Sequence, residues 1–360
     1  MTKDDIKAHD DVDDVWESLG NLGDISRALD KDVKYITSLK SRDEYTEMKN
    51  WNPKSIEQEL REYGGIIGQD AAVKAASIIL YNHSEGRSSV NLFCAPTGSG
   101  KTEIWRAMQR LYGTHNVFIV DSSMLTAEGW KGGTKISTIL RSLPLDERNS
   151  ITLVFDEFDK ILEPQFGSNG TNVSDLMQTQ LLKLFDHDEI YLGDETGKGN
   201  NIVLDTSNIT IVCLGAFQKL MEKKSQNSGS LGFGAKLRQT CDYSNSEITV
   251  DDLIDYGMRP ELAGRINRIV VMEPLDIKTM VAIAKNEVQK FSEAMDAEII
   301  VDENTLLMLS RIACEKQLGA RWIRSQLQLM IDDQIYEHPK AKKYIIGYEP
   351  DDSAELPCIE

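Results

Sequence analysis

The chain has 360 residues, and with 41% of them apolar it can bury the cores of two or three domains. Its 40 basic and 58 acidic side chains give a net charge of −18. This balance argues against nonspecific binding to nucleic acid, which needs clustered Lys and Arg. No apolar run approaches the ~20 residues of a membrane span, and the first residues lack a signal-peptide core. We therefore expect a cytoplasmic protein without membrane or nucleic-acid partners.

The five cysteines are scattered, and no C-x-x-C pair occurs among them. This usage is typical of a reduced intracellular protein with neither a disulfide framework nor a cysteine zinc site. We therefore expect no zinc.

Residues 1–51 are polar and acidic, with only fragmented helical patterning. They fit either a small helical module that binds a partner or substrate, or a loosely ordered arm. The pattern changes at Pro53, where Ile56, Leu60 and Tyr63 have helical spacing. Gly64-Gly65 is expected to end that helix.

Residues 66–272 alternate short apolar strands with helices, which is the pattern of a parallel α/β sheet. The predicted strands are Val90–Cys94, Asn116–Val120, Ile151–Phe155 and Ile209–Leu214. Two stretches rich in Gly, Ser and Asn, 167–175 and 225–234, are predicted to be long surface loops.

A glycine-rich segment follows the first predicted strand directly, and it is typical of a phosphate-binding loop. Its sequence is Ala95-Pro96-Thr97-Gly98-Ser99-Gly100-Lys101-Thr102. The two glycines allow backbone N–H groups to point at phosphates, Lys101 would reach the β- and γ-phosphates, and Thr102 would bind Mg²⁺. A helix expected from about Glu103 would turn its positive end toward the same anion. The segment departs from G-x-x-x-x-G-K-[ST] at Ala95, and the alternative is a glycine turn with a chance Lys-Thr.

Asp156 and Glu157 follow the apolar run Ile151–Phe155, where a buried parallel strand places function at its carboxyl end. Adjacent carboxylates have separate jobs in nucleotide hydrolysis. Asp156 would hold the Mg²⁺ shell, and Glu157 would orient and deprotonate the attacking water. The alternative is a solvated strand end that carries two acids.

After Glu273-Pro274 the pattern becomes helical. Two amphipathic stripes, Met280-Ile283-Val288-Phe291 and Leu306-Leu309-Ile312, are predicted to be core faces. Residues 347–360 form an acidic segment with two prolines, expected to be a frayed tail.

Further short motifs occur in order along the chain: Ile67-Gly68-Gln69, Asp205-Thr206-Ser207, Gly215-Ala216-Phe217, 259–265 (RPELAGR) and 319–325 (GARWIRS). With the phosphate loop and Asp156-Glu157, this set closely resembles the ClpX-type AAA+ protein unfoldases over about residues 52–345. The resemblance implies a large ATP-binding α/β domain at 52–272 and a small, mainly helical lid domain at 273–346. ClpX-type proteins normally carry a four-cysteine zinc module near the N-terminus, and here no cysteine precedes Cys94.

The same resemblance implies a homohexameric ring that binds ATP and Mg²⁺ between subunits. Ile67 and Gly68 would pack on adenine. Arg265 would be an arginine finger that reaches the γ-phosphate bound by the neighbouring subunit, a role that suits a permanently charged guanidinium. Arg321 would be a sensor of the γ-phosphate in the small domain. The alternative for each arginine is a surface salt bridge, and no polar sensor is assigned after Ile209–Leu214.

Two loops correspond by resemblance to mechanical parts. Trp130 and Lys131 fall where ClpX-type proteins have an aromatic pore loop that grips a translocating chain. Leu231-Gly232-Phe233 resembles the tripeptide that docks on a ClpP-type peptidase. The alternatives are an exposed turn for the first segment and an ordinary glycine turn for the second.

The sequence therefore indicates an ATP-dependent unfoldase that threads protein substrates through a pore and delivers them to a ClpP-type peptidase. A stand-alone remodeller without a peptidase is the nearest alternative. A nucleic-acid motor is disfavoured by the acidic balance and the aromatic pore loop. A nucleotide-gated scaffold with little turnover is disfavoured by Glu157 and Arg265.

Overall fold

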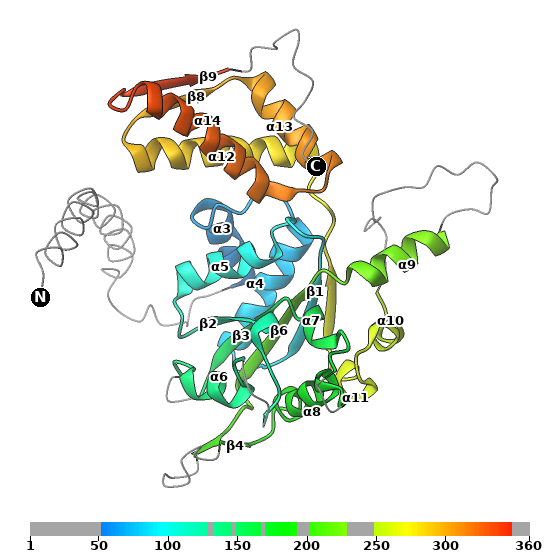
Figure 1. Ribbon diagram of the computed structural model, residues 1–360. Coiled ribbons are helices and arrows are strands. Elements are labelled where there is room, and N and C mark those ends of the chain that lie inside the picture. The colour runs from blue at the N-terminus through cyan, green and yellow to red at the C-terminus, as the bar shows by residue number, and fades with distance from the viewer. Residues whose placement is uncertain are drawn as a thin grey trace, which may run out of the picture. The chain divides into compact units, whose positions relative to one another are not determined.

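The computed structural model describes residues 52–128, 133–145, 149–166, 170–192, 202–228 and 248–347 (Figure 1). The described part opens with helices α3 (Pro53–Glu62) and α4 (Asp70–Ser84). Asn52 begins α3, because its side-chain oxygen accepts the N–H groups of the first turn. Ile56 and Leu60 are buried. The helix predicted after Pro53 is therefore confirmed, and it ends before the glycine pair.

Five parallel strands form the central sheet in the order β2-β3-β6-β1-β7. Their bounds are β1 Val90–Cys94, β2 Val117–Asp121, β3 Ile151–Asp156, β6 Ile209–Gly215 and β7 Arg268–Val271. The first four agree with prediction to within about a residue, as strand ends usually do. The sequence did not predict β7, because its short apolar run has no periodicity of its own and becomes a strand by pairing with β1.

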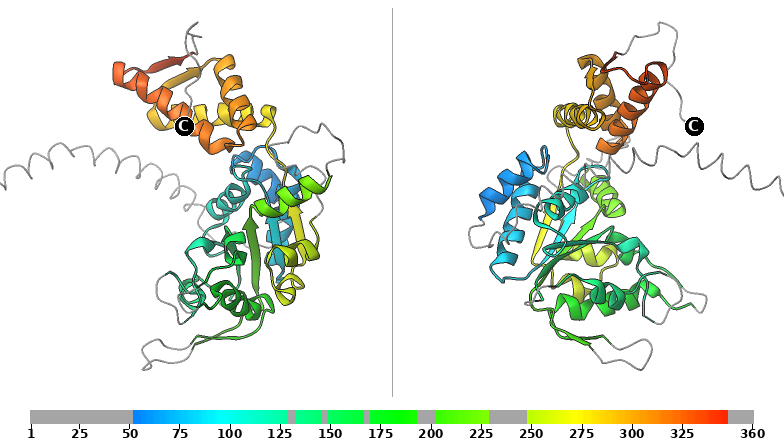
Figure 2. Two further views of the ribbon diagram at one scale, coloured as in Figure 1. Left: turned by 45° about the vertical axis from the view of Figure 1, so that its right-hand side comes forward. Right: turned by 90° about the vertical axis from the view of Figure 1, so that its left-hand side faces the viewer.

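Helices cover both faces of this sheet, as the two views of Figure 2 show. Helices α3, α4 and α5 (Lys101–Tyr112) pack on one face. The other face carries α6 (Ile136–Ser142), α7 (Asp159–Leu162), α8 (Val173–Phe185), α9 (Gln218–Ser228), α10 (Val250–Tyr256) and α11 (Pro260–Ala263). The strands supply both cores by alternation, since Phe93 and Val154 face α3–α5 while Leu92 and Leu153 face the opposite layer.

The smaller elements are the 3₁₀ turn η2 (Ser122–Met124) and the antiparallel pair β4 (Ile190–Leu192) and β5 (Ile202–Leu204). The predicted surface loops were partly wrong, because 173–175 belong to α8 and 225–228 to α9. The Asn172 side chain accepts the N–H of Ser174 at 3.2 Å. Polar residues there start a helix instead of forming a loop.

After β7 the chain forms a mainly helical region, in agreement with the predicted change of pattern. Its elements are α12 (Ile277–Met295), β8 (Glu298–Val301), α13 (Glu303–Glu315), α14 (Gly319–Glu337) and β9 (Lys343–Ile346). Met280, Leu306 and Leu309 are buried in its core as predicted. The parallel pair β8–β9 was not predicted. Within the described ranges, no helix combines the length and apolarity needed to cross a bilayer.

Candidate nucleotide-binding site

The glycine-rich loop connects β1 to α5 at the carboxyl edge of the sheet. Gly98 and Gly100 have φ angles of 78° and 91°, a left-handed conformation that glycine adopts without steric cost. Gly100 supplies no side-chain cap to α5, so the first N–H groups of this helix stay available to an anion. Phe93 on β1 packs edge-to-face on Trp105 of α5 at 5.7 Å and holds the two ends of the loop together.

A hydroxyl and a carboxylate meet beside this loop. The Thr102 Oγ1 donates to Asp156 Oδ1 at 3.1 Å. Thr102 comes from the first turn of α5 and Asp156 from the end of β3, and strand β6 separates β3 from β1. Mg²⁺ prefers such oxygen ligands and keeps several waters of its own. These two side chains therefore fit one edge of a magnesium shell.

Glu157 stands next to this pair in a strained backbone conformation. Its φ is 55°, a region that costs a residue with a side chain about 1–2 kcal/mol. Its N–H donates to Asp156 Oδ1 at 3.1 Å. The turn directs both carboxylates toward the same cavity, which Asp156 and Glu157 line together. Strain of this kind gathers at functional sites.

The loop, the carboxylates and the helical region enclose a cavity of about 640 Å³, a size typical of cofactor sites. One wall comes from the glycine-rich loop and Ile67. The other comes from α12 and α14, through Ile283, Asn286, Glu287, Lys290, Arg321 and Arg324. Apart from Arg321, the sequence did not predict these residues at the site. Ile283 was expected in the core, and the polar members have no motif that marks them.

Several of the charges around the cavity are neutralised in pairs. Glu287 is buried, and its carboxylate meets Lys290 at 2.7 Å and Arg324 at 3.6 Å. Lys101 and Arg321 differ, since neither side chain has a carboxylate within 4.0 Å among the described residues. Two cations without counter-charges, one on each wall, suit a polyphosphate.

Two contacts that the sequence did not predict join the loop to the helical region. The amide of Gln69 donates to the Ser99 carbonyl at 3.2 Å and to the Glu273 carbonyl at 2.7 Å. Gly98 also packs directly on Gly319 at the start of α14, so closely that a Cβ on Gly98 would lie 2.5 Å from the Gly319 Cα. The one sequence feature that pointed to Gln69 is its place in the Ile67-Gly68-Gln69 motif.

Most of the residues predicted for nucleotide and metal line the cavity: Ile67, Thr97, Gly98, Ser99, Gly100, Lys101, Thr102, Glu103, Asp156, Glu157 and Arg321. Three others are not among its described lining residues. Gly68 packs on Thr279, Pro96 accepts the Ser99 hydroxyl at 2.8 Å, and Arg265 lies beyond α11 against Asp186. The predicted pore loop (Trp130, Lys131) and docking tripeptide (Leu231, Gly232, Phe233) lie outside the described residues.

Burial excludes one alternative nucleophile near the loop. Cys94 ends β1 and is fully buried. Burial, with a contribution from the charge of Asp159, raises the pKa of its thiol to about 12. The thiol is therefore protonated at neutral pH and is not a nucleophile.

Known proteins match this chain over the same region. The AAA domain family (Cdc48 subfamily) matches residues 87–269. The chain is 30% identical to the ATP-dependent Clp protease ATP-binding subunit ClpX of Porphyromonas gingivalis, over 81% of this chain and 79% of the relative. It is 26% identical to ClpX of Treponema denticola, over 81% of this chain and 78% of that protein. It is also 26% identical to ClpX 3 of Methylococcus capsulatus, over 80% of this chain and 76% of that protein.

The family match runs from just before β1 to the second residue of β7, so it includes the glycine-rich loop and Asp156-Glu157. The sheet with its helical lid is accordingly the AAA+ fold, whose members use nucleotide and Mg²⁺. The chain belongs to the ClpX family of AAA+ ATPases, and it is an ATP hydrolase.

Proposed function

We propose that this protein is an ATP-driven unfoldase and translocase, which works as a homohexamer and threads substrate proteins through the pore of the ring. The observation that carries the proposal is the make-up of the cavity, with one wall from the glycine-rich loop and the other from α12 and α14. A nucleotide that touches both walls favours one arrangement of them, and its hydrolysis removes that preference. Cycles of ATP hydrolysis then become cycles of movement, which pulling on a polypeptide requires.

Within the cavity, Lys101 binds the β- and γ-phosphates and Ile67 supports the base, with Gly68 next to it in the chain. Thr102 and Asp156 hold the Mg²⁺, which when bound offsets negative charge on the phosphates. Their 3.1 Å contact supports this pairing.

Two further side chains act on the γ-phosphate end. Glu157 orients the attacking water and takes its proton. Arg321 reports the γ-phosphate to the helical region, and its lack of a described counter-ion supports an anionic ligand.

Arg265 acts on the ATP of the neighbouring subunit. Its absence from the described lining of its own subunit's cavity supports a role in trans. Exposed apolar side chains support a ring as well. Leu329 and Tyr336 lie seven residues apart on α14, and Ile300 pairs with Ile345 across β8–β9. Apolar groups of this kind favour contact with a second copy.

Trp130 grips the translocating chain, Lys131 makes the pore ring positive, and Leu231-Gly232-Phe233 docks on a ClpP-type peptidase. The resemblance in sequence supports these assignments, and so do the relatives' names, which describe subunits of a Clp protease.

The test is ATP-dependent loss of fluorescence from a stable tagged protein. It is run with and without a ClpP-type peptidase, and with DNA as a competitor. Glu157→Gln is the control that binds ATP without turnover. Unfolding that a peptidase converts into degradation, and that deletion of Leu231–Phe233 uncouples, supports the full proposal. Unfolding without coupling indicates a stand-alone remodeller, and ATPase activity that only DNA stimulates refutes the proposal.

A further inference from the structure

Arg265 needs support from outside its own element. It follows α11, which spans only Pro260–Ala263, and its side chain is about one-third exposed at 34%. A long side chain after so short a helix has many rotamers to lose before it reaches one geometry. Reaction with a bound phosphate depends on fixed placement, since a displacement of about 1 Å can cost ~10²-fold in rate.

Asp186, the C-terminal cap of α8, supplies that support. Its Oδ1 accepts from the Arg265 Nε, and its Oδ2 accepts from Nη2 at 2.9 Å. The Arg265 Nη1 donates to the Glu261 carbonyl. The hydrogen bond to Asp186, together with the charges of Asp186 and Glu261, raises the pKa of Arg265 and keeps it fully charged.

The geometry of this pair leaves room for a phosphate. A guanidinium has five N–H donors, and the carboxylate occupies its Nε–Nη2 edge. Among the described residues, one N–H on Nη1 and one on Nη2 are left without a partner. Two charged donors of this kind can bind phosphate oxygens.

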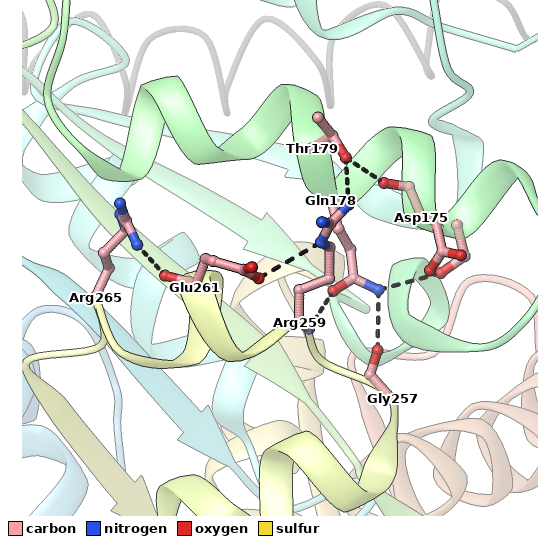
Figure 3. Close-up of polar contacts among 8 residues, drawn as sticks. Asp175, Gln178, Thr179, Gly257, Arg259, Glu261 and Arg265 are labelled. Atoms are coloured by element: carbon pink, nitrogen blue, oxygen red, sulfur yellow. Dashed lines mark hydrogen bonds and ion pairs between the residues drawn. The ribbon is translucent and has the colours of Figure 1, made fainter.

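Helix α8 also fixes the backbone that leads to Arg265, as Figure 3 shows. The Gln178 amide is fully buried, donates to the Gly257 carbonyl at 3.0 Å and accepts the Arg259 N–H at 2.7 Å. The Arg259 guanidinium donates to the Thr179 hydroxyl at 2.7 Å and pairs with Glu261 at 3.6 Å. The helix therefore holds both the start of α11 and the guanidinium beyond its end.

We propose that Asp186 is a positioning residue for Arg265: it holds one edge of the guanidinium so that the other edge meets the γ-phosphate bound by the neighbouring subunit. This inference rests on the proposed role of Arg265. Asp186 acts through the arginine alone. Gln178 is the second anchor of the same arrangement.

The experiment compares Asp186→Ala, Asp186→Glu and Arg265→Ala with the matched control Glu303→Ala, which removes the 2.9 Å surface ion pair to Lys285 in the helical region. Assembled rings are verified by mass, and kcat, KM and nucleotide affinity are measured separately. We expect Asp186→Ala to lower kcat roughly 10- to 100-fold, with KM and nucleotide affinity within about twofold. Asp186→Glu should recover part of the loss, and Glu303→Ala should change nothing.

A double variant separates positioning from general damage. In the Arg265→Ala background, Asp186→Ala should cost nothing more, because a residue that acts through the arginine has nothing left to position. A further loss there overturns the inference. Faster turnover in the Asp186→Ala single variant also overturns the inference, because it would mean that the carboxylate holds Arg265 away from the phosphate. If Arg265→Ala leaves turnover unchanged, the proposed role of Arg265 fails. If Arg265→Ala lowers turnover but Asp186→Ala leaves it unchanged, only the positioning role of Asp186 fails.

Discussion

Substitution of Gly319 by alanine should weaken nucleotide binding through a contact that lies outside the phosphate loop. Gly319 has a φ of 71°, and a Cβ added to it would meet the Gly98 Cα and lie 3.0 Å from the Gly98 carbonyl oxygen. The left-handed backbone costs alanine about 1–2 kcal/mol. The crowding costs about 1–3 kcal/mol more if nothing moves. Movement of α14 away from the loop relieves the crowding, and it also withdraws Arg321 from the phosphate end.

The crowding term alone therefore corresponds to a loss of roughly 5- to 150-fold in nucleotide affinity, at about 1.4 kcal/mol per tenfold. The assay is a calorimetric titration of a slowly hydrolysed ATP analogue into the purified protein, which gives the nucleotide affinity. Gly86→Ala is the matched control, since Gly86 has a φ of 73° and no atom within 4 Å of the added Cβ. It carries the backbone cost without the contact. Equal affinities for the two variants would refute the reasoning.

Glu157→Gln should leave ATP bound and lower turnover about 10²–10⁴-fold, so a rate near that of the unmodified protein would reject the general-base role. The unmodified protein should unfold substrates with acidic tails faster than substrates with basic tails, and Lys131→Val should reduce this difference in rate. Trp130→Ala should slow the unfolding of both kinds of substrate. Equal unfolding rates on the two tails in the unmodified protein would contradict this. Elemental analysis should find no stoichiometric zinc, because the five cysteines are scattered along the sequence without a C-x-x-C pair. Hydrogen bonds from the Thr279 side chain and backbone lower the pKa of Asp276, the N-terminal cap of α12. Its folded pKa lies below the unfolded value, so its stabilisation is present above about pH 4 and is lost as the pH falls through the folded pKa. Asp276→Ala should lower the free energy of unfolding by about 1 kcal/mol at pH 7. The difference between variant and unmodified protein, measured by urea unfolding, should shrink in acid. A constant difference from pH 7 to pH 3 would show that the charge of Asp276 does not contribute to stability.

The strands that carry the chemistry could be predicted because each is a continuous apolar run between clear boundaries. Val90–Cys94 and Ile151–Asp156 are buried on both faces, so their composition alone identifies them. The glycine-rich loop and Asp156-Glu157 were predictable for a related reason. Their chemistry needs particular residues at fixed distances from a strand end, and that requirement is local.

What the sequence did not predict depends on contacts between distant segments. The strands β8 and β9 each have four residues, and they pair across more than forty residues of chain. In the sequence, Gln178 is one polar residue among others on a helix, and its role becomes visible only through its contacts with Gly257 and Arg259. Glu287 would be expected at the surface by charge alone, yet Lys290 and Arg324 make its burial possible. Local periodicity contains none of this information.

The two contacts at the phosphate loop bear on how binding at one place is felt at another. Gln69 ties the Ser99 carbonyl to the Glu273 carbonyl, which lies where the chain leaves the sheet for α12. Gly319, at the start of α14, packs on Gly98. Any shift of the loop on phosphate binding must therefore displace one contact or be followed by both. Since the two contacts reach the helical region at different points, before α12 and at the start of α14, unequal shifts at Ser99 and Gly98 rotate that region as well as translating it. The loop thus has the geometry to convert the presence of a phosphate into an angle between the two walls of the cavity.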